Sequence, residues 1–284
     1  QAVLEVMEQT TDPRLRKIMT SLIEYLHGFI RDVELTEKEF RAATELLNDI
    51  GQHKTDTHNE MVLMAGSLGI SSLVCLLNNG NDDQLETKQS MLGPFWRLNS
   101  PRTENGESIV RSKTPGPCVF VDLYYVDTEG TPLAGVEVDV WHASTVGLYE
   151  SQDSTQADMN LRGKFTTDKT GHIWFGSIKP SGYPIPTDGV VGKLLAAQNR
   201  HPFRPAHLHA LAFKEGFKTL TSQIYSESDE KLESDVQFGV TEALIARYQR
   251  HDEPHPEESS VKAPWYTMDC ALVMEHGKAE LPAP

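Results

Sequence analysis

The sequence predicts a mainly β protein, an antiparallel β-sandwich preceded by an N-terminal α-helical region. Apolar residues recur at helical spacing between residues 15 and 50, and from about residue 100 they recur at every second position. The many short alternating segments are separated by turns rich in Gly, Asn and Asp, which favours a sandwich over a doubly wound sheet. In this chain of 284 residues we expect a helical domain at 1–100 and a β-sandwich domain at 101–284.

Three helices are expected in the first region. The first has an apolar face made of Leu15, Ile18, Met19, Leu22, Ile23, Leu26 and Ile30. Thr36, followed three residues later by Glu39, has the pattern of a capping box at the start of the second helix. The third is expected over residues 58–77. Its Gly and Ser residues interrupt the apolar run, so no membrane span is predicted.

The second region reads as a series of short strands. Alternating apolar residues predict strands at 119–125 and 136–140 on either side of a turn at 127–130. Residues 164–167 and 172–178 flank a second turn, at 168–171, in the pattern of a hairpin. Further strands are expected at 208–213, 221–225 and 265–274, with one late helix at 240–248.

Charge and cysteine content exclude several classes of protein. The chain has 26 Lys and Arg residues against 41 Asp and Glu residues, a net charge of −15. This argues against nucleic acid or an anionic membrane as a partner. Cys75, Cys118 and Cys270 lack metal-site spacing and are too few for a disulfide framework. With no signal-like start to the sequence, we expect a cytoplasmic protein with reduced thiols.

The densest chemical signal is the pair His207 and His209. Residues i and i+2 of a strand share a face, so the two imidazoles can bind one metal ion from positions roughly 7 Å apart along the backbone. Without further ligands, two histidines at this spacing are more often polar side chains of a half-exposed strand than a metal site. A cupin-type metal site is an alternative, because Glu215 follows six residues later, but the second sequence block of a cupin is missing.

Two tyrosines, in segments 139–149 (DVWHASTVGLY) and 181–189 (SGYPIPTDG), complete a wider pattern. Together with 204–209 (RPAHLH), these segments resemble the intradiol ring-cleavage dioxygenases. The resemblance extends through 92–95, 159–165 and 221–225, in the same order along the chain. It implies a non-haem Fe(III) cofactor bound by Tyr149, Tyr183, His207 and His209. Phenolate oxygen is a hard donor and suits a ferric ion.

The resemblance also implies the reaction, which is O2-dependent ring cleavage of a catechol-type aromatic diol. Tyr183 would be displaced by the substrate and take one of its protons. Arg204 would lie beside the ring and stabilise developing negative charge, with Gln223 close to that arginine. A sandwich that has lost its iron and only binds ligands is a remote alternative, and the presence of all four ligand types argues against it.

The helical first third points to the branch that contains catechol, chlorocatechol and hydroxyquinol dioxygenases. In that branch the helices form a homodimer interface and can hold a phospholipid in an apolar groove. Segments 183–189 and 159–163 are most similar to hydroxyquinol 1,2-dioxygenases. The expected reaction therefore converts hydroxyquinol to maleylacetate. The alternative is catechol, or a substituted catechol, cleaved to a cis,cis-muconate.

One departure bears on the substrate. Many hydroxyquinol enzymes carry an acidic residue on the third helix, facing the substrate's extra hydroxyl, and the matching residue here is Gly66. Glycine offers no side-chain acceptor and leaves space, so we expect a broad pocket. The expected walls are Leu63, Gly66, Leu92, Gly93, Pro94, Phe95, Ile185 and Pro186.

Overall fold

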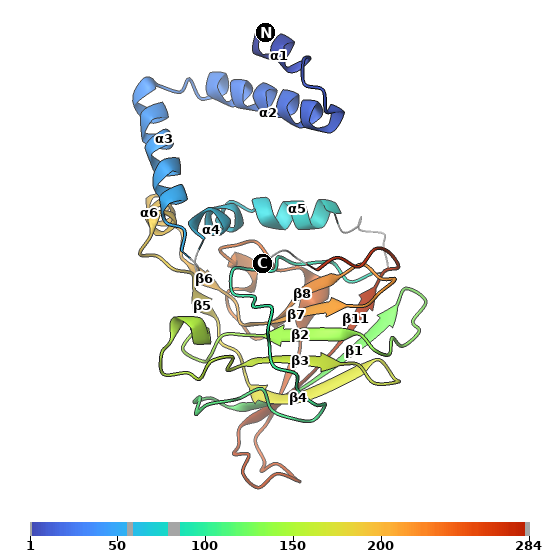
Figure 1. Cartoon of the computed structure of the whole chain (residues 1–284). Helices are drawn as coiled ribbons and strands as arrows, with labels where there is room; N and C mark the ends of the chain where they lie inside the picture. The colour runs from blue at the N-terminus through green and yellow to red at the C-terminus, as the bar shows by residue number, and fades with distance from the viewer. Residues whose placement is uncertain (1, 56–58, 79–85, 282–284) are drawn as a thin grey trace. The chain divides into compact units, whose positions relative to one another are not determined.

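The computed structural model describes residues 2–55, 59–78 and 86–281, and the chain divides into two compact units, residues 1–52 and 53–284 (Figure 1). The first unit contains helices α1 (Ala2–Met7), α2 (Pro13–Asp32) and α3 (Glu37–Gln52). The carboxylate of Asp12 caps α2 by accepting from the backbone N–H of Arg14 at 2.7 Å. The predicted capping box of α3 is confirmed. The backbone N–H of Thr36 donates to Glu39 at 2.9 Å, and that of Glu39 donates to Thr36 Oγ1 at 3.3 Å.

The second unit contains helices α4 (Glu60–Ser67), α5 (Ile70–Asn78) and α6 (Val190–Ala197). The prediction of one helix over 58–77 is wrong, because α4 and α5 meet at an angle of 76°. The bend lies at Gly69, whose φ of +72° belongs to the left-handed region that glycine enters freely. Residue 58 lies outside the described residues. Among the described helices none is long and apolar enough to cross a membrane alone; α4 and α5 have that length and composition only as a bent pair.

Two sheets form the body of this unit. One has the strand order β10-β11-β1-β4 and the other β3-β2-β7-β8-β9, while β5 and β6 form a separate short ribbon. Most neighbouring strands are antiparallel, but β1 with β11 and β8 with β9 are parallel. In chain order the strands are β1 (Cys118–Asp127), β2 (Glu137–Trp141), β3 (Arg162–Thr166), β4 (His172–Ile178), β5 (Tyr183–Pro184), β6 (Phe203–Arg204), β7 (His207–Phe213), β8 (Leu220–Ser226), β9 (Ile245–Ala246), β10 (Tyr248–His251) and β11 (Trp265–Met274).

Two sequence-based expectations for this unit are corrected. The turn at 168–171 forms, with the backbone N–H of Gly171 donating to Asp168 at 3.1 Å. However, β3 and β4 on its two sides belong to different sheets, so the turn connects the layers and is not a hairpin. The helix expected at 240–248 is also wrong. Leu244, Ala246 and Tyr248 are buried at every second position, which is the strand period, and β9 pairs with β8.

The core lies where the inner faces of the two sheets pack together. Val121 and Leu123 of β1 contribute to the same apolar cluster as Leu208 and Ala210 of β7. Since strand residues alternate between faces, His207 and His209, which alternate with Leu208 and Ala210 on β7, point to the other side of the sheet. The fold therefore places both histidines on the outer face of the five-stranded sheet. Each of the three cysteines is half-buried.

Candidate active site

His207 and His209 project from the same face of β7, and each is only 2% exposed. The neighbouring strands supply their surroundings in register. Trp141 of β2 lies opposite His209 and stacks on its ring, with centroids 4.6 Å apart and an interplanar angle of 8°. On the other side, β8 places Gln223 opposite His209 and Tyr225 opposite His207. The sheet register thus fixes both imidazoles among buried side chains.

Tyr149 and Tyr183 reach the histidines from two loop-rich segments. Tyr149 immediately precedes a single 3₁₀ turn (Glu150–Gln152), and its ring stacks on Phe95 at a centroid distance of 4.3 Å. Tyr183 lies on β5, where it pairs with Arg204 of β6. The two phenol oxygens are 3.2 Å apart. Both rings are buried, so the hydroxyls meet away from bulk water.

The four predicted metal ligands therefore come together although they are far apart in the sequence. Nε2 of His207 lies 3.2 Å from Nε2 of His209. The ring of Tyr183 lies 5.5 Å from that of His207, and the ring of Tyr149 lies 6.4 Å from that of His209. Two ligands at right angles on bonds of roughly 2.1 Å lie roughly 3 Å apart, so the 3.2 Å between the imidazole nitrogens and the 3.2 Å between the phenol oxygens suit donors that share one metal ion.

The protonation of the imidazoles also suits metal binding. Nδ1 of His207 lies 2.7 Å from the carbonyl oxygen of Pro205, so Nδ1 carries the proton and Nε2 keeps its lone pair. Burial, and after it the charge of Arg204, lowers the pKa of His207 to about 3. Burial and the neighbouring His207 hold the pKa of His209 well below its ordinary value. Both rings are neutral near pH 7, as metal ligands must be.

The two phenols, unlike the imidazoles, need a bound cation to reach the protonation state of a metal ligand. Burial raises the pKa of Tyr149 well above its ordinary value and also raises that of Tyr183, because a buried phenolate has lost its hydration. A bound cation reverses this balance by stabilising the phenolates. Within the described part of the chain no group of three or more His, Cys, Asp and Glu side chains could hold a metal. A metal held at this point would use the phenol oxygens beside the imidazoles, and two hard oxygen donors with two imidazoles fit a ferric ion.

Arg204 is the buried positive charge of the site, and it is 2% exposed. Its Nε and Nη2 donate to the two carboxylate oxygens of Asp235 at 3.1 and 3.0 Å. Nη2 also donates to Gln223 Oε1 at 2.8 Å, and Nη1 lies 3.3 Å from Nε2 of His207. Burial alone would lower the pKa of Arg204, but the charge of Asp235 outweighs it and holds the pKa well above its ordinary value. The guanidinium stays charged and fixed beside the ligands.

Sequence reasoning missed two members of this network. Asp235 lies in an irregular segment after a short 3₁₀ turn, where no periodicity or motif marks it. Tyr225 donates to Gln223 Oε1 at 2.6 Å and also accepts from Arg204 at 3.1 Å. It lies two residues after Gln223 on one strand, so the period-2 rule used for the histidines could have found it.

A second buried ion pair, also missed, lies behind Tyr149. Arg162 is 1% exposed, and its Nε donates to Glu150 at 2.7 Å. The same carboxylate oxygen accepts from Arg97 at 2.8 Å. The guanidinium carbon of Arg162 lies 5.9 Å from the centre of the Tyr149 ring. Arg162 occurs in one of the recognised sequence segments, but nothing in its spacing pointed to a place behind a ligand.

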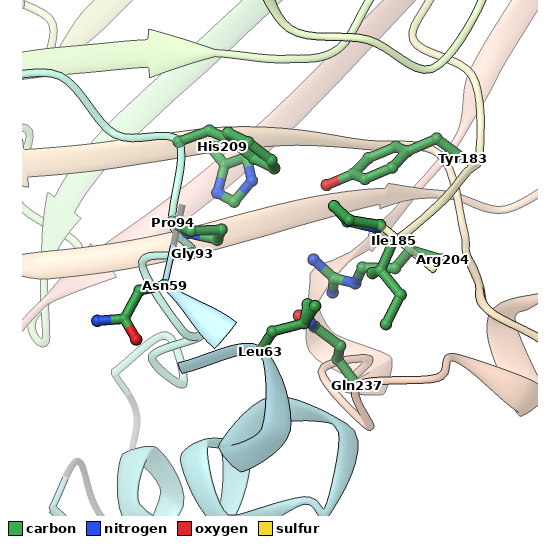
Figure 2. A pocket seen from close by; sticks show the side chains of 11 residues that line it. Asn59, Leu63, Gly93, Pro94, Tyr183, Ile185, Arg204, His209 and Gln237 are labelled. Atoms are coloured by element: carbon green, nitrogen blue, oxygen red, sulfur yellow. The ribbon is translucent and has the colours of Figure 1, made fainter. Parts of the chain in front are cut away.

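A pocket opens onto these groups (Figure 2). Tyr183, His209 and Arg204 contribute to its lining, together with Asn59 and Gln237, which the sequence did not suggest. Six of the eight expected wall residues line it, namely Leu63, Gly93, Pro94, Phe95, Ile185 and Pro186. The other two, Leu92 and Gly66, do not. Leu92 packs against the cluster around Phe95 and Tyr149, and Gly66 is covered by Gln237.

Comparison with known families gives a match along most of the chain. Residues 12–85 match a family model described as the catechol dioxygenase N terminus, and residues 91–270 match one described as a dioxygenase. A hydroxyquinol 1,2-dioxygenase of Rhizobium sp. is 38% identical over 94% of this chain and 90% of its own length. A catechol 1,2-dioxygenase of Candida albicans is 36% identical over 84% of this chain and 80% of its own.

Solved structures of other dioxygenases have a similar fold. The hydroxyquinol 1,2-dioxygenase of Pseudomonas putida DLL-E4 superposes with a TM-score of 0.88 at 33% identity, covering 96% of each chain. The catechol 1,2-dioxygenase of Pseudomonas arvilla C-1 gives a TM-score of 0.83 at 29% identity and covers 99% of this chain and 93% of its own. The similarity thus extends over both units.

Proposed function

The chain belongs to the intradiol ring-cleavage dioxygenases, in the catechol and hydroxyquinol branch, and from this premise we propose that its substrate is hydroxyquinol (1,2,4-trihydroxybenzene). One O2 is consumed for each substrate molecule. The carbon–carbon bond between the two adjacent hydroxyl-bearing carbons breaks, both oxygen atoms enter the product, and the product is maleylacetate. The observation that carries this proposal is the convergence of two phenol oxygens, two imidazole nitrogens and one buried guanidinium at a single pocket.

We further propose that Tyr149, Tyr183, His207 and His209 hold a ferric ion. When bound, this ion supplies a Lewis acid that keeps the two substrate oxygens deprotonated and makes the ring electron-rich towards O2. The substrate must lose two protons on binding. The phenol oxygen of Tyr183 takes one of them, and a hydroxide that the substrate displaces would leave with the other as water. Tyr183 suits this role because it lines the pocket, whereas Tyr149 lies behind it against Phe95 and Arg162.

Arg204 stabilises the negative charge that develops on the ring during O2 attack. Its positive charge is fixed before the substrate arrives, because Asp235 binds two of its nitrogens. Gln223 is a positioning residue. Its Oε1 accepts from Arg204, while its Nε2 donates to the carbonyl oxygen of Met91 at 2.5 Å. Apolar side chains at Leu63, Pro94 and Ile185 exclude water and orient the ring.

Catechol is the second candidate substrate. Two observations favour it, namely the 36% identical catechol 1,2-dioxygenase and the lack of an acidic side chain at Gly66. Initial rates on hydroxyquinol, catechol and 4-chlorocatechol, measured side by side on iron-loaded protein, decide between them. We expect hydroxyquinol to have the highest kcat/KM. A catechol kcat/KM above that of hydroxyquinol would contradict the assignment of substrate while leaving the ring-cleavage assignment intact.

Gly93 should be more sensitive to substitution than its loop position suggests. Its φ is +77°, and a Cβ there would lie 3.3 Å from Cε1 of His209. We expect Gly93→Ala to cost about 1–2 kcal/mol of unfolding free energy from the left-handed backbone. Displacing His209 by a few tenths of an ångström should also lower kcat/KM roughly 3- to 10-fold. Urea denaturation and steady-state kinetics measure the two effects.

Gly130→Ala is the matched control for this substitution. Gly130 has a φ of +82°, but no atom lies within 4 Å of the position that a Cβ would take there. It should therefore show the same loss of stability with unchanged kinetics. If Gly93→Ala keeps the kcat/KM of the unsubstituted enzyme, the proposed contact with His209 has no role in catalysis.

We propose that the N-terminal helices form a homodimer interface with an apolar groove able to bind a phospholipid. The exposed apolar residues of the first unit support this proposal. No residue of α2 is buried, and its apolar stripe includes Leu22, Leu26 and Phe29, all at least 45% exposed. We place the enzyme in the reducing cytoplasm, because three cysteines without the spacing of a disulfide framework are typical of that compartment. Light scattering of the full chain and lipid extraction followed by mass spectrometry test the dimer and the lipid.

A further inference from the structure

Gln237 occupies the side of the pocket that lies away from the proposed metal ligands. In Figure 2 its side chain lies next to Leu63, whereas His209 and Tyr183 lie across the pocket. Its backbone is held at two points. The N–H donates to Asp235 at 3.2 Å, and the carbonyl oxygen accepts from Ser72 of α5 at 3.0 Å. The residue that fixes Arg204 therefore also fixes Gln237.

The absence of a side chain at Gly66 makes room for the Gln237 amide. A Cβ on Gly66 would lie 3.0 Å from Cδ, 3.1 Å from Nε2 and 3.4 Å from Oε1 of Gln237. The space expected to be open at Gly66 is therefore filled by a polar group from another segment. That segment lies between β8 and β9, far from α4 in the sequence, so no sequence spacing relates the two residues.

The side chain of Gln237 lines the pocket and its amide is uncommitted. The residue is 5% exposed, and its side chain makes no hydrogen bond to any other residue that the structure describes. Arg204 and Tyr183, by contrast, are already engaged with Asp235 and Tyr149. Asn59 uses its amide oxygen to cap α4. A ligand that fills the pocket removes water from this amide, so a ligand group that pairs with it gains affinity over one that does not.

We propose that Gln237 is a specificity-determining residue whose amide hydrogen-bonds the third hydroxyl of a 1,2,4-trihydroxybenzene. This inference rests on the proposed function, which places the two adjacent hydroxyls at the ligands. A hydroxyl at ring position 4 then points away from the ligands, towards the side of the pocket formed by Gln237 and Leu63. An amide can both donate to and accept from a phenol hydroxyl, so it matches this group without a carboxylate.

The amide selects substrates mainly by penalising those that lack the third hydroxyl. Catechol or 4-methylcatechol would leave the buried amide unpaired, and a methyl group would also desolvate it. Sites that hydrogen-bond a substrate hydroxyl discriminate strongly against analogues without it. For one neutral amide we expect a preference of roughly 10- to 100-fold in kcat/KM for hydroxyquinol over 4-methylcatechol. The two compounds match closely in size, so their ratio isolates the hydrogen bond from the volume of the pocket.

The test compares this ratio in the unsubstituted enzyme, in Gln237→Leu and in the control Gln249→Leu. Gln249 is exposed on β10, and its amide donates only to a backbone carbonyl. We expect Gln237→Leu to lower the ratio roughly 10- to 100-fold by reducing kcat/KM for hydroxyquinol, with 4-methylcatechol cleaved as well or better. Gln249→Leu should leave the ratio unchanged. A ratio in Gln237→Leu within twofold of the starting value would overturn the inference.

Gly66→Ala tests the same contact from the other side and is decisive if Gln237→Leu does not fold. Alanine favours the helix at this position, but its methyl group must push the Gln237 amide away by a few tenths of an ångström. The ratio should fall roughly 3- to 10-fold, and an unchanged ratio would refute the role of Gln237. The experiment can refute the proposed function and the role of Gln237 independently. An enzyme that cleaves neither compound between its hydroxyls refutes the proposed function, whereas cleavage with an unaltered ratio refutes only the inference.

Discussion

Asp235→Ala is expected to lower the free energy of unfolding by about 3–5 kcal/mol, because it leaves the guanidinium of Arg204 buried without its counter-charge. The side chains of both residues are at most 3% exposed, so water cannot replace the lost partner. The same substitution frees Arg204 to rotate and removes the acceptor for the backbone N–H of Gly239. We therefore also expect kcat to fall at least roughly 100-fold, since the charge beside the ring is no longer held in place.

Urea denaturation and steady-state kinetics on the full chain measure both effects. Asp252→Ala is the matched control, because Asp252 also pairs with an arginine, Arg250, but both side chains are more than half exposed. Exposed pairs contribute about 0–1 kcal/mol, so the control should be nearly neutral in stability and activity. Asp235→Asn should lie between the two. If Asp235→Ala loses no more stability than the control, the buried pair does not have the proposed structural role.

The second large effect is expected from Tyr149→Phe, which removes one proposed ligand oxygen and nothing else. The ring should stay in place, since it stacks on Phe95 and is 1% exposed. Loss of a partner outside the ligand set typically costs 10- to 100-fold in metal affinity, so loss of a ligand should cost at least ~100-fold. We expect the purified variant to hold little iron, to lose the visible colour of a ferric phenolate, and to lose ring-cleavage activity in proportion.

Tyr125→Phe provides the comparison for this variant. Tyr125 is also fully buried, but it lies in the sandwich core on β1, and its hydroxyl has no hydrogen-bond partner among the described residues. Its removal should leave iron content and kinetics unchanged. Elemental analysis and visible absorption distinguish the two variants. Full iron content in Tyr149→Phe would remove this residue from the ligand set.

The part of the site that depends on alternation along a single strand could be predicted from the sequence. Alternation along one strand places His207 and His209 on a single face, and that face proved to be the outer side of the sheet. The capping box at Thr36 and the strands at 208–213 and 265–274 were predictable for the same reason, because each depends on local spacing. The family resemblance then added Tyr149, Tyr183, Arg204 and Gln223, which no periodicity relates to the histidines.

What could not be predicted depends on contacts between distant segments. Asp235 and Gln237 lie in an irregular loop, and only the folded chain brings them to Arg204 and Gly66. The open space inferred at Gly66 was therefore filled from elsewhere. The break between α4 and α5 depends on the backbone conformation of Gly69, which residue type permits but does not require. The division of the chain into domains at residue 100 stays a prediction, since compactness separates residues 1–52 from 53–284.

The central claim is that this chain cleaves hydroxyquinol between its adjacent hydroxyls at a ferric site. The most direct test incubates iron-loaded protein with hydroxyquinol under ¹⁸O2, records oxygen uptake and identifies the product by mass spectrometry and NMR. We predict one O2 consumed per substrate and maleylacetate carrying both labelled atoms. A ring opened outside the two adjacent hydroxyl-bearing carbons, or full activity in colourless, iron-free protein, would contradict the claim.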